Sequence, residues 1–128
     1  MKESAFSRAL KPHLPGDVSR IESGSTECGI PDINGSSEGV DYWVENKVCD
    51  NKRDIRMVTS LLRPEQKVWH LARAKQGARI FVCVKYSFGV DLYWVLEPIE
   101  KNATVAYYKR VGIIASYAEV GEIISKLL

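Results

Sequence analysis

The chain has 128 residues, 45% of them hydrophobic and 27% charged, and a formal net charge of +2. This length fits one domain over residues 1–128, and the composition excludes a disordered chain. No apolar run approaches the roughly 20 residues of a membrane helix, and residues 1–5 lack the apolar stretch of a secretory signal, so an intracellular protein is expected. The three cysteines are widely spaced, which predicts buried thiols rather than a zinc centre or a disulfide framework.

The charges are unevenly distributed along the chain. Residues 1–46 hold four basic and eight acidic side chains, whereas residues 47–85 hold ten basic and three acidic ones. An acidic segment beside a basic one suits a protein that holds a divalent metal and binds phosphate. An ordinary mixed surface explains the same pattern, and charge alone favours that simpler interpretation.

The first half of the chain predicts one helix and three extended segments, over residues 3–11, 18–23, 30–33 and 40–48. Proline cannot donate a backbone hydrogen bond, so Pro31 predicts a strand at the edge of the sheet or one with a bulge. Residues 34–39 are predicted to connect a hairpin. Within the last strand, alternation places Trp43, Glu45 and Lys47 on one face, opposite Asn46 and its neighbours.

The second half predicts a charged loop over residues 50–59, a helix from Pro64 to about Gln76, strands over 79–85, 90–96 and 104–109, and a final helix. Ser116 and Glu119 form a capping box at the start of that last helix. Val68, Leu71 and Ala72 are predicted to face the core from the middle helix. The tryptophans are expected in the core, and the two histidines, His13 and His70, at the surface. The order of elements predicts a mixed α/β domain around one sheet.

Two short segments carry the chemistry: Gly29-Ile30-Pro31-Asp32 and Val44-Glu45-Asn46-Lys47. Twelve residues separate Asp32 from Glu45, enough for a hairpin that brings the two carboxylates together beside Lys47. Burying such charges is costly unless they are paired or bind a metal, and oxygen ligands suit Mg²⁺ or Mn²⁺. The alternative is a surface hairpin with a cross-strand Glu–Lys pair, and spacing alone does not decide between the two.

These segments resemble the signature of the PD-(D/E)xK nuclease superfamily, especially its small phage and virus-type members, which include junction-resolving endonucleases and the virus-type replication–repair nuclease domain. The resemblance covers roughly residues 3–85 and rests on an ordered set of motifs: Glu3 in the first helix, Pro31-Asp32, Glu45-Asn46-Lys47 and Arg63-Pro64-Glu65-Gln66. Asn46 departs from the pattern, which commonly has an apolar residue there. The resemblance implies a restriction-endonuclease-like αβββαβ core around a mixed central sheet, followed by additional strands and a final helix.

The resemblance also implies roles for individual residues. Asp32 and Glu45 would hold Mg²⁺, with Mn²⁺ able to substitute, and the Asn46 carbonyl is a candidate third ligand. Lys47 would position the attacking water. Among the remaining candidates, Gln66 would contact the lysine or the scissile phosphate, Glu3 would hold a second metal, and Glu22 competes with Glu3 for that role. Each of these three has a simpler interpretation: Gln66 as a first-turn polar residue, Glu3 as a favourable charge at a helix N-terminus, and Glu22 as a surface acid of a strand.

A basic cluster after the candidate site is expected to contact DNA phosphates: Lys52, Arg53, Arg56, Arg63 and Lys67. The resemblance implies a Mg²⁺-dependent DNA endonuclease that acts as a homodimer on branched or Holliday-junction DNA in recombination or repair. Such an enzyme would need no small-molecule cofactor beyond the metal, would contact no membrane, and would work in the cytoplasm of a bacterial or phage-infected host cell. Two alternatives stay open: a repair or restriction-like nickase on duplex or flap DNA, and a nuclease-fold module that binds DNA without cutting it.

Overall fold

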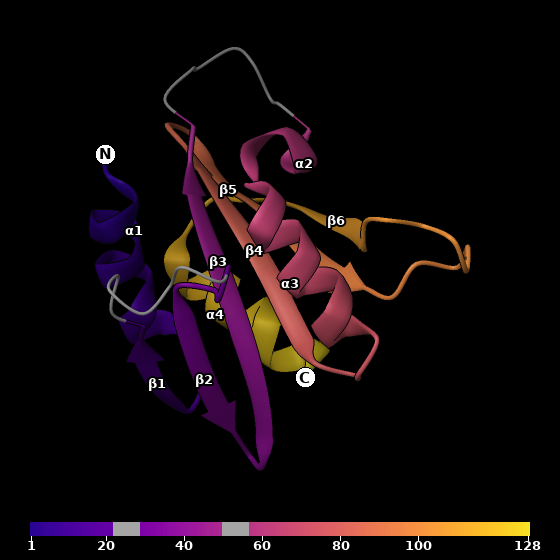
Figure 1. Cartoon of the computed structure of the whole chain (residues 1–128). Coiled ribbons are helices and arrows are strands. Elements are labelled where there is room, and N and C mark those ends of the chain that lie inside the picture. The colour runs from indigo at the N-terminus through magenta and orange to yellow at the C-terminus, as the bar shows by residue number, and fades with distance from the viewer. Residues whose placement is uncertain (22–28, 50–56) are drawn as a thin grey trace.

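The computed structural model describes residues 1–21, 29–49 and 57–128. Its described residues build one six-stranded sheet in the order β1-β2-β3-β4-β5-β6, in which only β3 and β4 run parallel (Figure 1). The elements are α1 (Glu3–Leu10), the 3₁₀ helix η1 (Lys11–His13), β1 (Asp17–Arg20), β2 (Ile33–Ser37), β3 (Val40–Val48), α2 (Val58–Leu61), α3 (Pro64–Ala74), β4 (Arg79–Tyr86), β5 (Gly89–Leu96), β6 (Tyr107–Ile114) and α4 (Tyr117–Leu127). This order contains the predicted αβββαβ core, the additional strands and the final helix.

Helices cover both faces of the sheet, which gives the domain two apolar cores (Figure 1). One core joins α1 and α4 to the sheet through Phe6, Leu10, Val44, Phe81 and Ile124. The other lies under α2 and α3 and contains Val58, Leu62, Ala74, Ile80 and Val82. Because side chains alternate along a strand, β3 contributes to both cores, and its two faces are those predicted from the sequence.

The hairpin between β2 and β3 differs from its prediction. The first strand was expected over residues 30–33, with a six-residue connection; β2 instead begins at Ile33 and continues to Ser37. A two-residue turn suffices because Glu38 and Gly39 adopt positive φ angles of 51° and 81°, the conformation that tight hairpins require. Neither an edge strand nor a bulge results from Pro31, since the proline precedes β2, which pairs regularly with β3 and lies between β1 and β3.

Other element boundaries shift modestly. The strand predicted over residues 104–109 is Tyr107–Ile114, with a register shift in its pairing to β5 between Leu92 and Tyr93. Helix α3 ends at Ala74, and Gly77 just beyond it has a φ of 83°. The Ser116 N-cap of the last helix is confirmed, because the Glu119 N–H donates to Ser116 Oγ at 3.2 Å, and the two side chains meet through Ser116 Oγ donating to Glu119 Oε1 at 3.1 Å. No helix within the described residues is long and apolar enough to cross a membrane.

The inner face of α3 is the largest departure from the sequence prediction. Val68, expected to face the core, is 66% exposed, and Ala72 is exposed as well. The helix instead buries Gln66, His70 and Ala74, which recur every four residues on one side. The prediction failed because it followed the apolar residues, whereas two of the three buried positions are polar. His70, expected at the surface, has no exposed area at all.

Candidate active site

The predicted site lies at the end of β3, on the side of the sheet that α3 covers. Glu45 and Lys47 alternate with the apolar-core residues Val44 and Val48, so both side chains point toward the α3 side. Glu45 is 1% exposed and Lys47 is 8% exposed. Charged groups are rarely buried to this extent unless they are paired or bind an ion.

Asp32 reaches β3 through a hydrogen bond to the backbone. The pairing of β2 with β3 starts at Ile33 and Val44, so beyond Val44 this edge of β3 has no β2 residue beside it. The Asp32 carboxylate takes that place: its Oδ2 accepts from the Asn46 N–H at 2.8 Å. The N–H and C=O of one strand residue point to the same side, so the Asn46 carbonyl is also directed toward Asp32.

Gly29 fixes the approach of the Asp32 segment to α3. Its φ is 79°, and a Cβ at this position would lie 2.2 Å from the Glu65 carbonyl oxygen. Any residue with a side chain would therefore push the segment away from the first turn of α3. This close packing supplies a physical reason for glycine at the start of the Gly-x-Pro-Asp segment.

Asp32 and Glu45 interact directly. Burial raises the pKa of Glu45 well above its ordinary value, and a hydrogen bond with Asp32 and the charge of Asp32 raise it further, while the Lys47 charge acts in the opposite direction. Glu45 Oε1 is buried and has no hydrogen-bond partner among the described residues. Two adjacent carboxyls, one with an unsatisfied buried oxygen, form a hard-oxygen donor set that a divalent cation would satisfy.

The protein supplies only part of a complete coordination shell. Within residues 1–21, 29–49 and 57–128, no group of three or more His, Cys, Asp or Glu side chains is arranged to hold a metal ion. Asp32, Glu45 and the Asn46 carbonyl therefore offer two carboxylates and one backbone oxygen. Mg²⁺ commonly keeps several waters and takes only one or two protein carboxylates, so this donor set fits it.

Glu3 approaches the site from the first turn of α1. Its Oε1 lies 4.0 Å from Lys47 Nζ, and its side chain is half exposed. The structure thus brings Glu3 to the lysine, and the Glu3 charge also helps to raise the pKa of Glu45. A half-exposed carboxylate at this distance contributes modestly to stability, but it places a negative charge next to the candidate site.

Gln66 is buried at 3% exposure and closes the N-terminus of α3. Its Oε1 accepts from the Arg63 N–H at 2.8 Å, which satisfies a backbone donor that the helix leaves free. Gln66 therefore has a structural role at this helix end whatever else it contacts.

The sequence prediction missed two residues behind the site, His70 and Tyr108. His70 Nδ1 lies 2.7 Å from the Tyr108 hydroxyl, and its Nε2 is buried with no partner among the described residues. Burial, together with the Lys47 charge, lowers the pKa of His70 to about 4, so the imidazole is neutral at pH 7. Burial, together with the Glu45 charge, raises the pKa of Tyr108. The signal available in the sequence was the four-residue spacing of His70 from Gln66.

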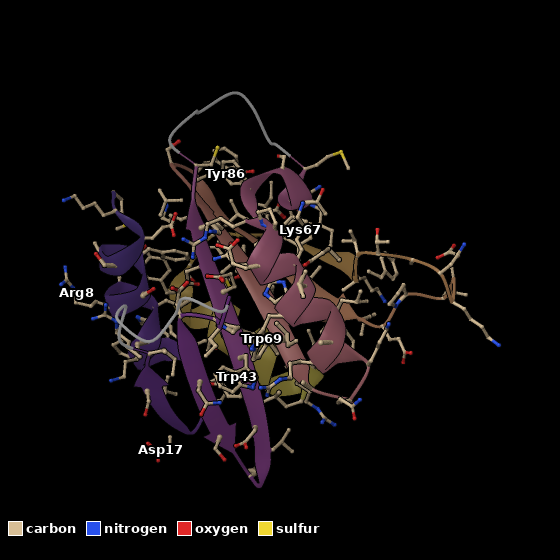
Figure 2. All side chains as sticks on the ribbon, in the orientation of Figure 1. Arg8, Asp17, Trp43, Lys67, Trp69 and Tyr86 are labelled. Atoms are coloured by element: carbon tan, nitrogen blue, oxygen red, sulfur yellow. The ribbon has the colours of Figure 1, made fainter. Side chains whose placement is uncertain are left out.

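Of the predicted basic cluster, the structure describes Arg63 and Lys67. Arg63 is exposed and pairs with Glu65 at 3.2 Å, and Lys67 is partly exposed on α3. Lys52, Arg53, Arg56 and Glu22 lie outside the described residues. Farther along α3, the Arg73 guanidinium lies 4.7 Å above the Trp69 ring, and Trp69 contacts Trp43 edge to face at 5.2 Å (Figure 2).

Comparisons with known proteins show the fold. No protein family model matches the chain, and no curated protein matches its sequence. Among solved structures, the chain is similar to the Holliday junction resolvase Hjc of the archaeal hyperthermophile Archaeoglobus fulgidus, with a TM-score of 0.51 and 16% identity over 98% of each chain. With the six-stranded mixed sheet and its helices, this likeness shows a restriction-endonuclease-like fold.

Proposed function

We propose that the protein is a metal-dependent DNA endonuclease that hydrolyses phosphodiester bonds. The observation that carries the proposal is the contact between Asp32 and the buried Glu45, next to Lys47, toward the end of β3 in a restriction-endonuclease-like sheet. A structural hairpin alone does not account for a buried carboxyl next to a second acid, since repulsion and desolvation both oppose folding.

Some residues of the site would bind the ion, and others would position the reactants. Asp32, Glu45 and the Asn46 carbonyl would hold Mg²⁺ or Mn²⁺. The ion supplies Lewis-acid stabilisation of charge on the phosphoryl oxygens and lowers the pKa of a water. Lys47, held at the site by its burial and by Glu3, places an ammonium group where it orients the attacking water and offsets the negative charge of the transition state.

Two further residues have supporting roles. Glu3 acts on Lys47 through its charge. It is also the candidate ligand of a second metal, which it would bind through bridging waters. Gln66 is held at the N-terminus of α3 by its bond to Arg63 and would contact Lys47 or the scissile phosphate. Arg63 and Lys67 on the same helix present positive charge for phosphate contacts, and so do Lys52, Arg53 and Arg56.

The proposed substrate is branched DNA, such as a four-way junction. The likeness of fold to a Holliday junction resolvase and the motif resemblance to small junction-resolving nucleases both support this choice. A symmetric homodimer would present two such sites to two strands of one junction. Such a protein would function inside the cell, where its DNA substrate arises during recombination or repair.

A cleavage assay tests the proposal. Purified protein is incubated with a four-way junction, a linear duplex and a flap in the presence of Mg²⁺, Ca²⁺ or EDTA. We expect Mg²⁺-dependent cleavage with preference for the junction, and loss of cleavage in Asp32→Asn, Glu45→Gln and Lys47→Ala. Asp41→Asn is the matched control, because Asp41 is an exposed acid on β3, away from the site.

The alternatives give different results. Equal cutting of all three DNAs would replace junction selectivity with a duplex or flap nickase. Binding to DNA without any cleavage in Mg²⁺ or Mn²⁺ would identify a non-cleaving module and contradict the proposal.

A further inference from the structure

His70 occupies the inward face of α3 one turn after Gln66 and is completely buried. A buried imidazole without hydrogen bonds is unfavourable, so its partners indicate its role. One nitrogen is accounted for by the Tyr108 hydroxyl at 2.7 Å. The other, Nε2, points into the protein interior without a partner among the described residues.

The sheet register relates Tyr108, the hydrogen-bond partner of His70, to the candidate site. One row of paired residues crosses the face of the sheet that α3 covers. It runs from β3 to β6 through Trp43, Ile80, Val95 and Tyr108. Glu45 is two residues beyond Trp43 on the same face of β3, so its row is the next one along.

Aromatic contacts connect the ends of this row beneath α3. Trp43 contacts Trp69, the Trp69 ring lies 6.3 Å from the His70 ring, and the His70 ring lies 5.7 Å from Tyr108. Figure 2 shows Trp43 and Trp69 next to one another on the α3 side of the sheet. These contacts hold the imidazole in one orientation.

The unsatisfied atoms around His70 are complementary. When the Tyr108 hydroxyl donates to Nδ1, the neutral imidazole carries its hydrogen on Nε2. That N–H is a buried donor lacking a partner, and Glu45 Oε1 is a buried acceptor lacking one. The Trp69 ring contacts both Trp43, two residues before Glu45 on the same face of β3, and His70, so the two atoms lie on the same side of the sheet under α3.

We propose that His70, anchored by Tyr108, is a positioning residue that supports Glu45 and Lys47 from the buried side of the site and so fixes the geometry that holds the divalent ion. This inference rests on the proposed function. The Nδ1 side of the ring is committed to Tyr108, which leaves Nε2 as the nitrogen available to the acidic pair. A neutral ring also avoids placing a second positive charge beside the buried Lys47.

Two substitutions separate the two ring nitrogens. Asparagine carries its amide near the position of Nδ1, and glutamine extends its amide to the position of Nε2. We therefore expect His70→Asn to weaken Mg²⁺ and Mn²⁺ binding by about 10- to 100-fold, the range typical of residues that orient metal ligands. His70→Gln keeps a donor at the Nε2 position but loses the Tyr108 anchor, so it should weaken binding less than His70→Asn does, by no more than about 10-fold. Exposed His13→Asn is the matched control and should bind as the wild type does.

The measurement is calorimetric titration of the full chain with MgCl₂ or MnCl₂ without DNA, after circular dichroism has confirmed that each variant is folded. If His70→Asn does not fold, Tyr108→Phe replaces it, because this change removes only the anchoring hydroxyl. It should weaken metal binding by about 10-fold. The inference is overturned if folded His70→Asn, or Tyr108→Phe where it replaces that variant, binds the metal with wild-type affinity. It is also overturned if His70→Asn and His70→Gln lose affinity equally.

Failure of the proposed function is distinguishable from failure of this inference. If the wild type binds no divalent ion and cuts no DNA, the proposed function fails and takes the inference with it. If the wild type binds the ion and cuts DNA while the His70 variants match it in affinity, only the inference fails.

Discussion

The backbone N–H of Asn46 donates to Asp32 Oδ2 at 2.8 Å, and this bond joins the segment before β2 to the strand that carries Glu45 and Lys47. It brings two acids separated by twelve residues together beside β3. Because it uses the backbone of Asn46, the side chain at position 46 is free to point to the opposite face, where Asn46 Nδ2 donates to Ser7 Oγ at 2.9 Å.

Stability and activity should change in opposite directions at Glu45. Burial and Asp32 raise the pKa of Glu45, so its contribution to stability is present below its unfolded pKa and lost as pH rises through the folded value. Without metal at pH 7, the free energy of unfolding of Glu45→Gln should therefore equal that of the wild type or exceed it by roughly 1 kcal/mol. Cleavage should fall at least about 100-fold.

Urea denaturation at pH 7 with EDTA, and again with Mg²⁺, measures this effect. Added Mg²⁺ should stabilise the wild type and leave Glu45→Gln unchanged, since only the wild type binds the ion. A Glu45→Gln variant that is strongly destabilised without metal would contradict the account of a repelling acidic pair.

The pH dependence of stability should reveal the buried His70. Its folded pKa of about 4 lies below the ordinary value of 6.5, so between these values the unfolded chain binds a proton that the native protein does not. His70 therefore contributes stability that is complete above pH 6.5 and lost as pH falls to about 4, on the order of 3 kcal/mol.

Comparison of the wild type with His70→Asn isolates this contribution, because Glu45 is present in both proteins. Denaturation measured at pH 7 and at pH 4.5 should show a smaller loss of stability in the variant. Equal losses in the two proteins would mean that His70 is solvated and titrates normally.

The departure of Asn46 from the apolar residue of the motif should affect packing rather than cleavage. Ser7→Ala alone leaves the Asn46 amide without its partner in the core and should cost about 1–3 kcal/mol. The double variant Ser7→Ala/Asn46→Leu replaces both polar groups and should recover most of that loss. Chemical denaturation measures both effects. Cleavage by the double variant should stay within a few-fold of the wild type, and a complete loss would show that the Asn46 side chain acts in the site.

Gly29 and Gly39 form a matched pair for testing how the Asp32 segment docks on α3. Both have positive φ angles, 79° and 81°, but a Cβ would meet the Glu65 carbonyl at Gly29 and open space at Gly39. Gly39→Ala should cost about 1 kcal/mol of strain and keep its activity. Gly29→Ala should lose more stability and most of its cleavage, as measured by thermal unfolding and the junction assay. Similar effects at the two positions would show that the contact with Glu65 does not position Asp32.

Alternation along β3 made much of the fold predictable from the sequence. The bounds Val40–Val48 and the opposite faces of Glu45 and Asn46 follow from a two-residue period, which a strand enforces strictly. Proline and glycine marked the helix ends, because each acts locally: proline restricts the backbone and glycine frees it. The ordered motifs then placed Asp32 close to Glu45.

The buried polar residues could not be predicted in this way. Apolar periodicity assigned Val68, Leu71 and Ala72 to the inner face of α3, and of these only Leu71 packs against the core. The protein buries Gln66 and His70 on that face, where they bond to Arg63 and Tyr108. Tyr108 is 38 residues from His70 in sequence, and no local pattern connects them. The two-residue turn at Glu38–Gly39 was also missed, because a non-glycine residue with positive φ gives little signal in the sequence.

Titration with Mn²⁺ followed by electron paramagnetic resonance tests the central claim most directly. The wild type at neutral pH should bind Mn²⁺ at a site that requires both acids, so that Asp32→Asn and Glu45→Gln each lose this binding while Asp41→Asn retains it. Wild-type protein that binds no Mn²⁺, or a folded Glu45→Gln variant that binds it with unchanged affinity, would contradict the claim that Asp32 and Glu45 hold a divalent ion together.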